Sequence, residues 1–143
     1  MKRIAIDTNV YAAFKRGDPD VVKLLRGAEF IAVSSIVMGE LLAGFRCGKR
    51  TEKNRQELEQ FLTSPRVHLA GVDEETAEFY AVIFEQLRRK GQPIPTNDLW
   101  IAASAVQLGL GLATMDAHFR CIDGLVLVLS GGRYGNHDVA RGR

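Results

Sequence analysis

The stretch Arg3-Ile4-Ala5-Ile6-Asp7-Thr8-Asn9 sets a pattern that repeats along the chain. Its apolar run predicts a buried strand over residues 3–7, and the spacing that follows predicts a helix over residues 8–15. Short apolar runs alternate with longer helical patterns in the rest of the sequence. Such alternation is typical of βαβ units, so we predict an α/β fold with a central, mostly parallel sheet.

Caps and chain breakers place the remaining elements. Asp18 and Asp73 are expected helix N-caps, and Gly91 and Gly109 are expected to end their helices. Thr76 stands at the third helical position, where a full capping box has Glu or Gln. Further strands are expected over residues 30–34, 66–70, 111–114 and 125–129, and helices over residues 19–28, 36–46, 51–62, 74–90 and 96–108.

The composition is that of an ordinary soluble globular protein. The chain has 143 residues, 46% hydrophobic and 25% charged, with a net charge of +2. This length predicts one domain over residues 1–130, followed by a Gly- and Arg-containing tail over residues 131–143 that we expect to be flexible. The mildly basic charge permits a polyanionic partner without requiring one.

Several classes of protein are not favoured by the sequence. Apolar runs stay shorter than the ~18 residues of a membrane span, and the run before Asp7 is too short for a signal peptide, so we expect a cytoplasmic protein. Cys47 and Cys121 lack metal-ligand spacing and are expected to be free thiols, with a disulfide as the alternative. The histidines are scattered at positions 68, 118 and 137, so no zinc site is predicted.

Four acidic residues are candidates for a site. Asp7 and Asp116 each follow a predicted strand, and in parallel sheets ligands bind at the carboxyl ends of strands. Glu40 lies on an apolar helix face without a Lys or Arg within one turn, and an unpaired buried carboxylate costs several kcal/mol. Asp98 shares a face with core residues at the start of its helix. Asp123, in an Asp-Gly turn, is excluded.

Each of the four acids also has a structural alternative. Asp7 and Asp116 are in place to cap the turns that follow them. Asp98 favours the dipole of its helix by its first-turn position. Glu40 at the border of its helix would reach solvent.

If the four acids converge, their charges need compensation. Two carboxylates ~4 Å apart repel by about 4 kcal/mol at an effective dielectric constant near 20. Oxygen ligands from Asp and Glu suit Mg²⁺ or Mn²⁺ rather than Zn²⁺. Such a set therefore predicts metal-assisted hydrolysis of a phosphodiester.

Four short motifs follow one another along the chain: residues 4–9 (IAIDTN), 34–41 (SSIVMGEL), 97–103 (NDLWIAA) and 112–119 (LATMDAHF). In this order they resemble the PIN-domain family, and most closely its VapC-type toxins of type II toxin–antitoxin pairs. The resemblance covers nearly all of residues 1–129.

This resemblance implies a PIN-like α/β/α sandwich and a Mg²⁺-dependent endoribonuclease. The acids that match the family's metal pocket are Asp7, Glu40, Asp98 and Asp116, and Glu40 is left open as a metal ligand or as a group that orients the attacking water. The hydroxyl of Thr114 would support the pocket. Thr8 or Asn9 would help by hydrogen-bonding a carboxylate or the phosphate. The expected partners are RNA, a second copy of the chain in a homodimer, and a cognate VapB-like antitoxin.

Basic residues near the pocket are the expected RNA contacts, with a plain solvated surface as the alternative. They are Lys49, Arg50, Lys53 and Arg55, and Arg133, Arg141 and Arg143 in the tail. An aspartyl-phosphate phosphatase is disfavoured, because its D-x-D pattern would need an acid where Asn9 stands. Two alternatives stay open: a PIN-type nuclease of RNA processing outside toxin–antitoxin systems, and a non-catalytic module that binds basic peptides in an acidic groove.

Overall fold

The structure, a computed structural model, describes residues 2–128. Within this range the chain forms one sheet with the strand order β3-β2-β1-β4-β5, and every neighbouring pair is parallel. The prediction of an α/β fold with a parallel sheet is confirmed. The strands are β1 (Lys2–Ile6), β2 (Ala28–Ser34), β3 (Val67–Ala70), β4 (Gly111–Ala113) and β5 (Leu127–Val128).

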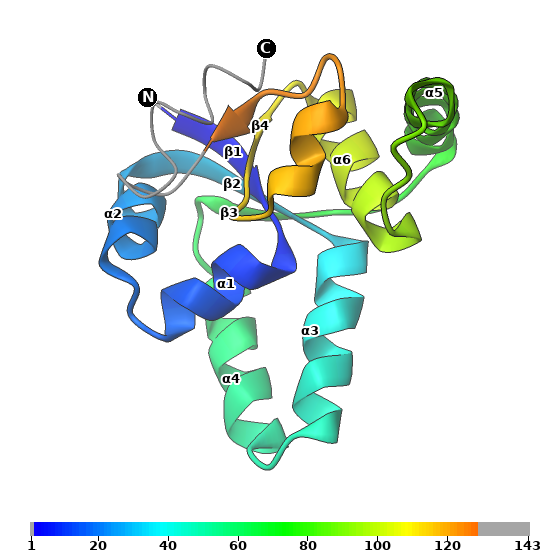
Figure 1. Ribbon diagram of the computed structural model, residues 1–143. Coiled ribbons are helices and arrows are strands. Elements are labelled where there is room, and N and C mark those ends of the chain that lie inside the picture. Colours follow the sequence, from blue (N-terminus) through cyan, green and yellow to red (C-terminus); the bar gives the residue numbers. More distant parts are fainter. Residues whose placement is uncertain (1, 129–143) are drawn as a thin grey trace.

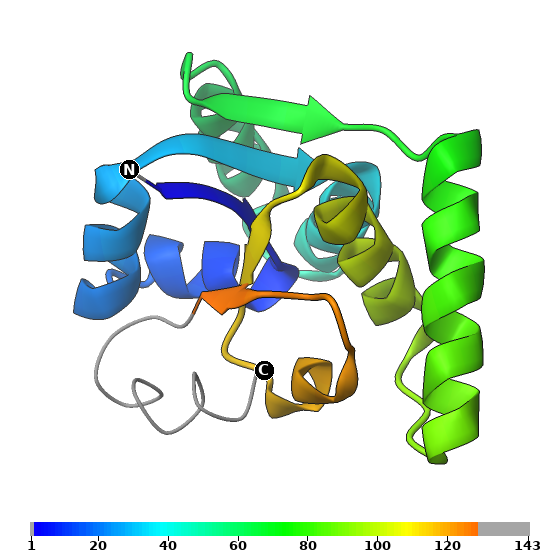
Figure 2. The ribbon, with the colours of Figure 1, turned by 90° about the horizontal axis from the view of Figure 1, so that it is seen from above.

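Helices cover both faces of the sheet, as in an α/β/α sandwich. In the view of Figure 1, α1, α3 and α4 lie below the sheet, α2 lies to its left, α6 and η1 lie to its right, and α5 lies outside α6. Figure 2 shows the same arrangement from above. The helices are α1 (Thr8–Lys15), α2 (Pro19–Gly27), α3 (Ser35–Cys47), α4 (Thr51–Leu62), α5 (Glu74–Lys90), α6 (Thr96–Leu108) and the 3₁₀ helix η1 (Ala117–Cys121).

The order of the strands explains why the helices divide in this way. From β1 the chain moves outward to β2 and β3, and it then returns to β4 and β5 on the other side of β1. Right-handed crossovers place the connecting helices of these two directions on opposite faces. The direction in which the chain adds strands to the sheet therefore reverses between β1 and β4, although all strands stay parallel.

The predicted caps are present. Asp18 accepts hydrogen bonds from the backbone at the start of α2, with Pro19 at the first helical position. Gly91 and Gly109 end α5 and α6 in the left-handed conformation, which glycine adopts without steric cost. Asp73 and Thr76 do form a reciprocal capping box, because the threonine hydroxyl accepts from the Asp73 N–H at 3.0 Å in the place of a Glu or Gln side chain.

Some predicted boundaries differ from the structure. β2 begins at Ala28, two residues before the predicted start, since Ala28 pairs with Lys2 of β1. Within the described residues β5 is only Leu127–Val128, because its partner β4 offers a short pairing edge. Residue 129 of the predicted last strand and the predicted tail at residues 131–143 lie outside the described residues.

The core lies between the central strands and the helices on both faces. Ile4 and Ile6 of β1 are buried, as are Ile31 and Val33 of β2 and Leu112 of β4. Burial on both faces makes these strands continuous apolar runs. No helix between residues 2 and 128 is long and apolar enough to cross a membrane. Cys47 and Cys121 are unpaired, in agreement with the prediction of free thiols.

Candidate active site

The candidate site lies between β1 and β4, where the order of strand addition reverses. In open α/β sheets the ligand crevice forms outside the carboxyl ends of the strands at such a switch point. Asp7 directly follows β1, and Thr114 directly follows the neighbouring strand β4. The register aligns Ile6 with Ala113, so both polar residues leave the sheet at the same level.

Asp7 is buried, with 4% of its surface exposed. Its Oδ1 accepts a hydrogen bond from the backbone N–H of Val10 at 2.9 Å, which caps α1. Its Oδ2 accepts a hydrogen bond of 2.5 Å from the hydroxyl of Thr114. The capping role that the sequence offered as an alternative is therefore real, and it holds the carboxylate at the strand end.

Thr114 connects two of the acids. While its hydroxyl donates to Asp7, the same oxygen accepts from the backbone N–H of Asp116 at 2.9 Å. Asp116 is the N-cap of η1, where its Oδ1 accepts from the N–H of His118 at 3.4 Å. A single buried hydroxyl thus positions both the Asp7 side chain and the turn that carries Asp116.

Glu40 joins the site from α3 and is half-buried. Its Oε1 accepts a hydrogen bond of 2.5 Å from the hydroxyl of Thr8, in the first turn of α1. Its Oε2 accepts one of 3.2 Å from the side-chain amide of Asn97, in the first turn of α6. Glu40 therefore does not extend freely into solvent but bridges two helix starts at the edge of the crevice.

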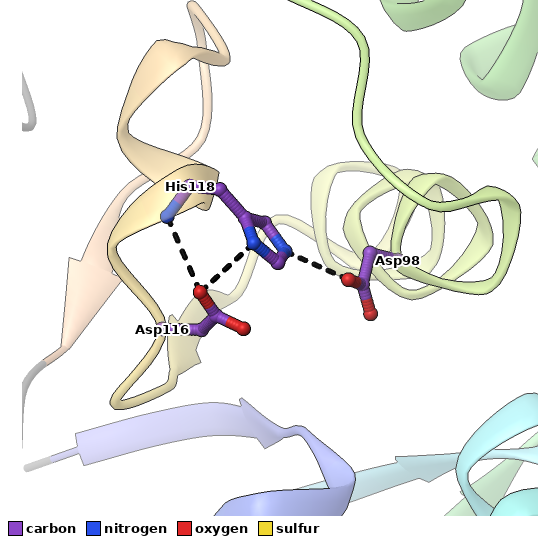
Figure 3. A group of neighbouring side chains, drawn as sticks. All are labelled: Asp98, Asp116 and His118. Carbon is purple, nitrogen blue, oxygen red and sulfur yellow. Dashed lines mark hydrogen bonds and ion pairs between the residues drawn. The ribbon is translucent and has the colours of Figure 1, made fainter.

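Asp98 lies in the first turn of α6, as predicted, and faces His118 (Figure 3). His118 Nε2 is 2.7 Å from Asp98 Oδ2, and its Nδ1 is 2.9 Å from Asp116 Oδ1. The ring thus links acids that come from two separate elements. Ligand atoms of Asp98, Asp116 and His118 all lie within 4.8 Å of one another, so these three residues form a group that could hold a metal ion.

The electrostatics tie the acids into one set. Burial raises the pKa of Asp7 to about 6, against hydrogen bonds from Thr114 and Val10, and the charges of Asp116 and Asp98 raise it further. Burial also raises the pKa of Asp98; His118 opposes this shift, and the charges of Asp116 and Glu40 add to it. The neighbouring charges thus make Asp7 and Asp98 harder to ionise, and a bound cation would relieve this repulsion.

Two residues that contact the candidate acids were not singled out in the sequence. The scattered histidines led to no predicted zinc site, and His118 lies among the acids, two residues after Asp116 in a tight turn. Asn97 precedes Asp98 at the helix start and supports Glu40. Thr8 hydrogen-bonds a carboxylate, as the resemblance implies, whereas Asn9 is exposed and its side chain makes no hydrogen bond within residues 2–128.

The donor set fits a divalent cation with a preference for oxygen ligands. Within residues 2–128 the group with ligand atoms close enough to share one ion is Asp98, Asp116 and His118, and it does not include Asp7 or Glu40. Asp7 is linked to this group by the charges of Asp98 and Asp116, and Glu40 by its charge acting on Asp98. Carboxylate oxygen is the ligand type of Mg²⁺ and Mn²⁺. Each of the two ring nitrogens of His118 already faces one carboxylate, Nε2 that of Asp98 and Nδ1 that of Asp116.

The fold is that of a parallel α/β domain with acidic residues at its switch point. The chain belongs to the PIN domain family, whose model matches residues 4–125. Ribonuclease VapC4 of Mycobacterium tuberculosis is 31% identical to it over 124 residues, which cover 85% of this chain and 92% of that one. Ribonuclease VapC2 of Rickettsia felis is 34% identical over 127 residues, which cover 85% and 93%.

A solved structure supports the same relationship. The VapBC2 structure from Rickettsia felis, bound to a DNA fragment from their promoter, aligns with a TM-score of 0.80 at 28% identity. The alignment covers 90% of this chain and 98% of that chain. The predicted family, with its similarity to VapC ribonucleases, is thereby confirmed.

Proposed function

We propose that this protein is a Mg²⁺-dependent endoribonuclease, with Mn²⁺ as a working substitute, and that it is the toxin of a toxin–antitoxin pair. The observation that carries the proposal is the placement of Asp7, Glu40, Asp98 and Asp116 around the β1–β4 switch point. There the charges of Asp116 and Asp98 add to the raised pKa of Asp7, and those of Asp116 and Glu40 add to the raised pKa of Asp98. Such repulsion is kept in a fold when the acids serve a bound cation.

The residues divide the work between them. Asp7, Asp98 and Asp116 would hold the cation, and the hydroxyl of Thr114 keeps Asp7 and Asp116 in register. Glu40, whose two oxygens already accept hydrogen bonds from Thr8 and Asn97, orients the attacking water. A divalent cation bound here would polarise the scissile phosphate and lower the pKa of a bound water.

The RNA would approach along the projecting hairpin of α3 and α4. Figure 1 shows these two helices extending together away from the sheet, and their tip carries exposed Lys49, Arg50, Lys53 and Arg55. Glu40 lies about 10 Å along α3 from the end of the helix at Cys47, seven residues at ~1.5 Å each. Phosphates held at the tip would therefore place a neighbouring phosphate near the acids.

The toxin role is supported by the relatives. Several solved structures that resemble this chain are VapBC complexes, including that from Rickettsia felis. We infer a VapB-like antitoxin as the partner of this chain, a homodimer as its assembly and the cytoplasm as its location. An RNA-processing nuclease outside toxin–antitoxin systems and a non-catalytic acidic groove are the rival functions.

Two measurements test the proposal. Purified protein should cleave RNA internally with Mg²⁺ and stop when EDTA is added, and an inactive protein that binds no Mg²⁺ or Mn²⁺ would favour the non-catalytic groove. Induced expression should arrest growth, and co-expression of a small neighbouring reading frame should restore it. Cleavage without growth arrest would favour RNA processing and contradict the toxin role.

A further inference from the structure

His118 contacts two carboxylates through both nitrogens of one ring. Asp98 is presented by α6 and Asp116 by the turn after β4, and the ring nitrogens lie 2.7 Å and 2.9 Å from one oxygen of each (Figure 3). The imidazole is planar and rigid, so it fixes the separation of the two carboxyl groups. Without it, two like charges from separate elements would face each other across the crevice.

The backbone around His118 holds the ring in this position. Its N–H donates to Asp116 Oδ1, and its carbonyl accepts from the thiol of Cys121 at 2.9 Å. The next residue, Phe119, is buried in the core. The η1 turn is therefore anchored on both sides of the histidine, and the ring does not depend on a flexible loop.

The ring of His118 contacts only one of the two oxygens of each carboxylate. Asp98 engages the ring through Oδ2 and Asp116 through Oδ1, while Asp98 Oδ1 and Asp116 Oδ2 accept no hydrogen bond from residues 2–128. In Figure 3 no dashed line joins either of these oxygens to the imidazole. By contrast, both oxygens of Asp7 and both oxygens of Glu40 are already hydrogen-bonded.

We propose that His118 is a positioning residue for the metal centre: it binds one oxygen of Asp98 and one of Asp116, leaves the other oxygen of each free to hold a cation, and is not itself a ligand. Direct ligation would require the ring to give up a carboxylate. The inference rests on the proposed function only in that a divalent cation binds among the acids, and it does not depend on RNA as the substrate. Polar partners of this kind set the orientation of metal ligands.

The test is a Mn²⁺ titration of the full-length, metal-free protein, followed by the electron paramagnetic resonance signal of free Mn²⁺. His118→Ala should weaken binding by about 10- to 100-fold, the usual effect of losing such a partner. His118→Gln keeps one hydrogen-bond donor, so its Mn²⁺ affinity should lie between those of the parent protein and His118→Ala. His68→Gln is the matched control, since His68 stacks on Phe30 at the distant strand β3. Unchanged affinity in His118→Ala would overturn the proposal.

A second readout separates positioning from ligation. Electron spin-echo spectra of the Mn²⁺ complex should lack the ¹⁴N coupling of a directly bound imidazole. A strong coupling that disappears in His118→Ala would make His118 a ligand and overturn its positioning role. Thermal unfolding of the metal-free variants confirms that they are folded. If Mn²⁺ binds as expected but RNA is not cleaved, the proposed function fails while the role of His118 stands.

Discussion

The hydroxyl of Thr114 donates a 2.5 Å hydrogen bond to Asp7, although 107 residues separate the two in the sequence. They meet because β1 and β4 are neighbours at the centre of the sheet. Both side chains are buried, Thr114 completely. The most buried acid of the candidate site is thus held by a strand that forms near the end of the chain, which couples the site to completion of the fold.

Removing this hydroxyl should weaken both stability and metal binding. Thr114→Val keeps the shape but leaves Oδ2 of Asp7 without its donor, while Oδ1 still accepts from the N–H of Val10. An unsatisfied buried acceptor costs about 1–3 kcal/mol. Urea unfolding at neutral pH should show this loss, and Mn²⁺ affinity should fall by about tenfold. Thr114→Ser, which retains the hydroxyl, is the control. A valine variant as stable as the parent would contradict the role assigned to this hydrogen bond.

The raised pKa of Asp7 predicts how stability depends on pH. The pKa of Asp7 is about 6 in the folded protein, against 3.8 in the unfolded chain. The contribution of Asp7 to stability is therefore complete below pH 3.8 and is lost as the pH rises through 6. The difference corresponds to about 3 kcal/mol. In EDTA, the advantage of Asp7→Asn over the parent in free energy of unfolding should therefore grow from pH 4 to pH 7. A pH-independent difference would refute this.

Asn97 should affect RNA cleavage through its hydrogen bond to Glu40. Asn97→Ala removes the 3.2 Å hydrogen bond to Oε2 and leaves Glu40 held only by Thr8. Because an outer partner of this kind is worth about 10-fold or more, we expect RNA cleavage to slow by about tenfold with little change in melting temperature. Thr96→Ala, an exposed neighbour in the same helical turn, is the control. Equal rates for the two variants would exclude a specific role for Asn97.

The basic tip of the α3–α4 hairpin should contribute to RNA affinity through phosphate contacts. Each contact to single-stranded RNA contributes a slope of about −0.7 to the dependence of log K on log salt concentration. A Lys49→Ala, Arg50→Ala double variant should bind an uncleaved RNA more weakly and lower the magnitude of that slope by about 1.4. Lys23→Ala, exposed on α2, should leave it unchanged. An unaltered slope in the double variant would place the RNA elsewhere.

The sequence predicted the sheet and most helices because their signals are local. Asp18-Pro19, Gly91 and Gly109 mark helix ends by backbone chemistry that needs no tertiary partner. The ends of β2 and β5 were misplaced for the opposite reason. Strand length depends on how far the neighbouring strand extends, and the pairing of Ala28 with Lys2 is a long-range property.

The residues of the candidate site also differ in whether local sequence or long-range packing determines their place. Asp7 and Asp116 were recognisable because they follow apolar strands, and Glu40 because its helix face lacks a basic partner. The contacts of His118 were not predictable, since they depend on how α6 packs beside η1. Spacing along the chain brings His118 close to Asp116 but carries no information about Asp98, twenty residues away.

The central claim is that the four acids form one metal centre that cleaves RNA, and the rate of Mg²⁺-dependent cleavage by Asp7→Asn tests it most directly. Asparagine can still cap α1, and it removes a buried charge, so the variant should fold at least as stably as the parent. Loss of a direct metal ligand should lower the cleavage rate at least about 100-fold, beyond the effect of an outer partner. Cleavage by a folded Asp7→Asn protein at the parent's rate would contradict the account.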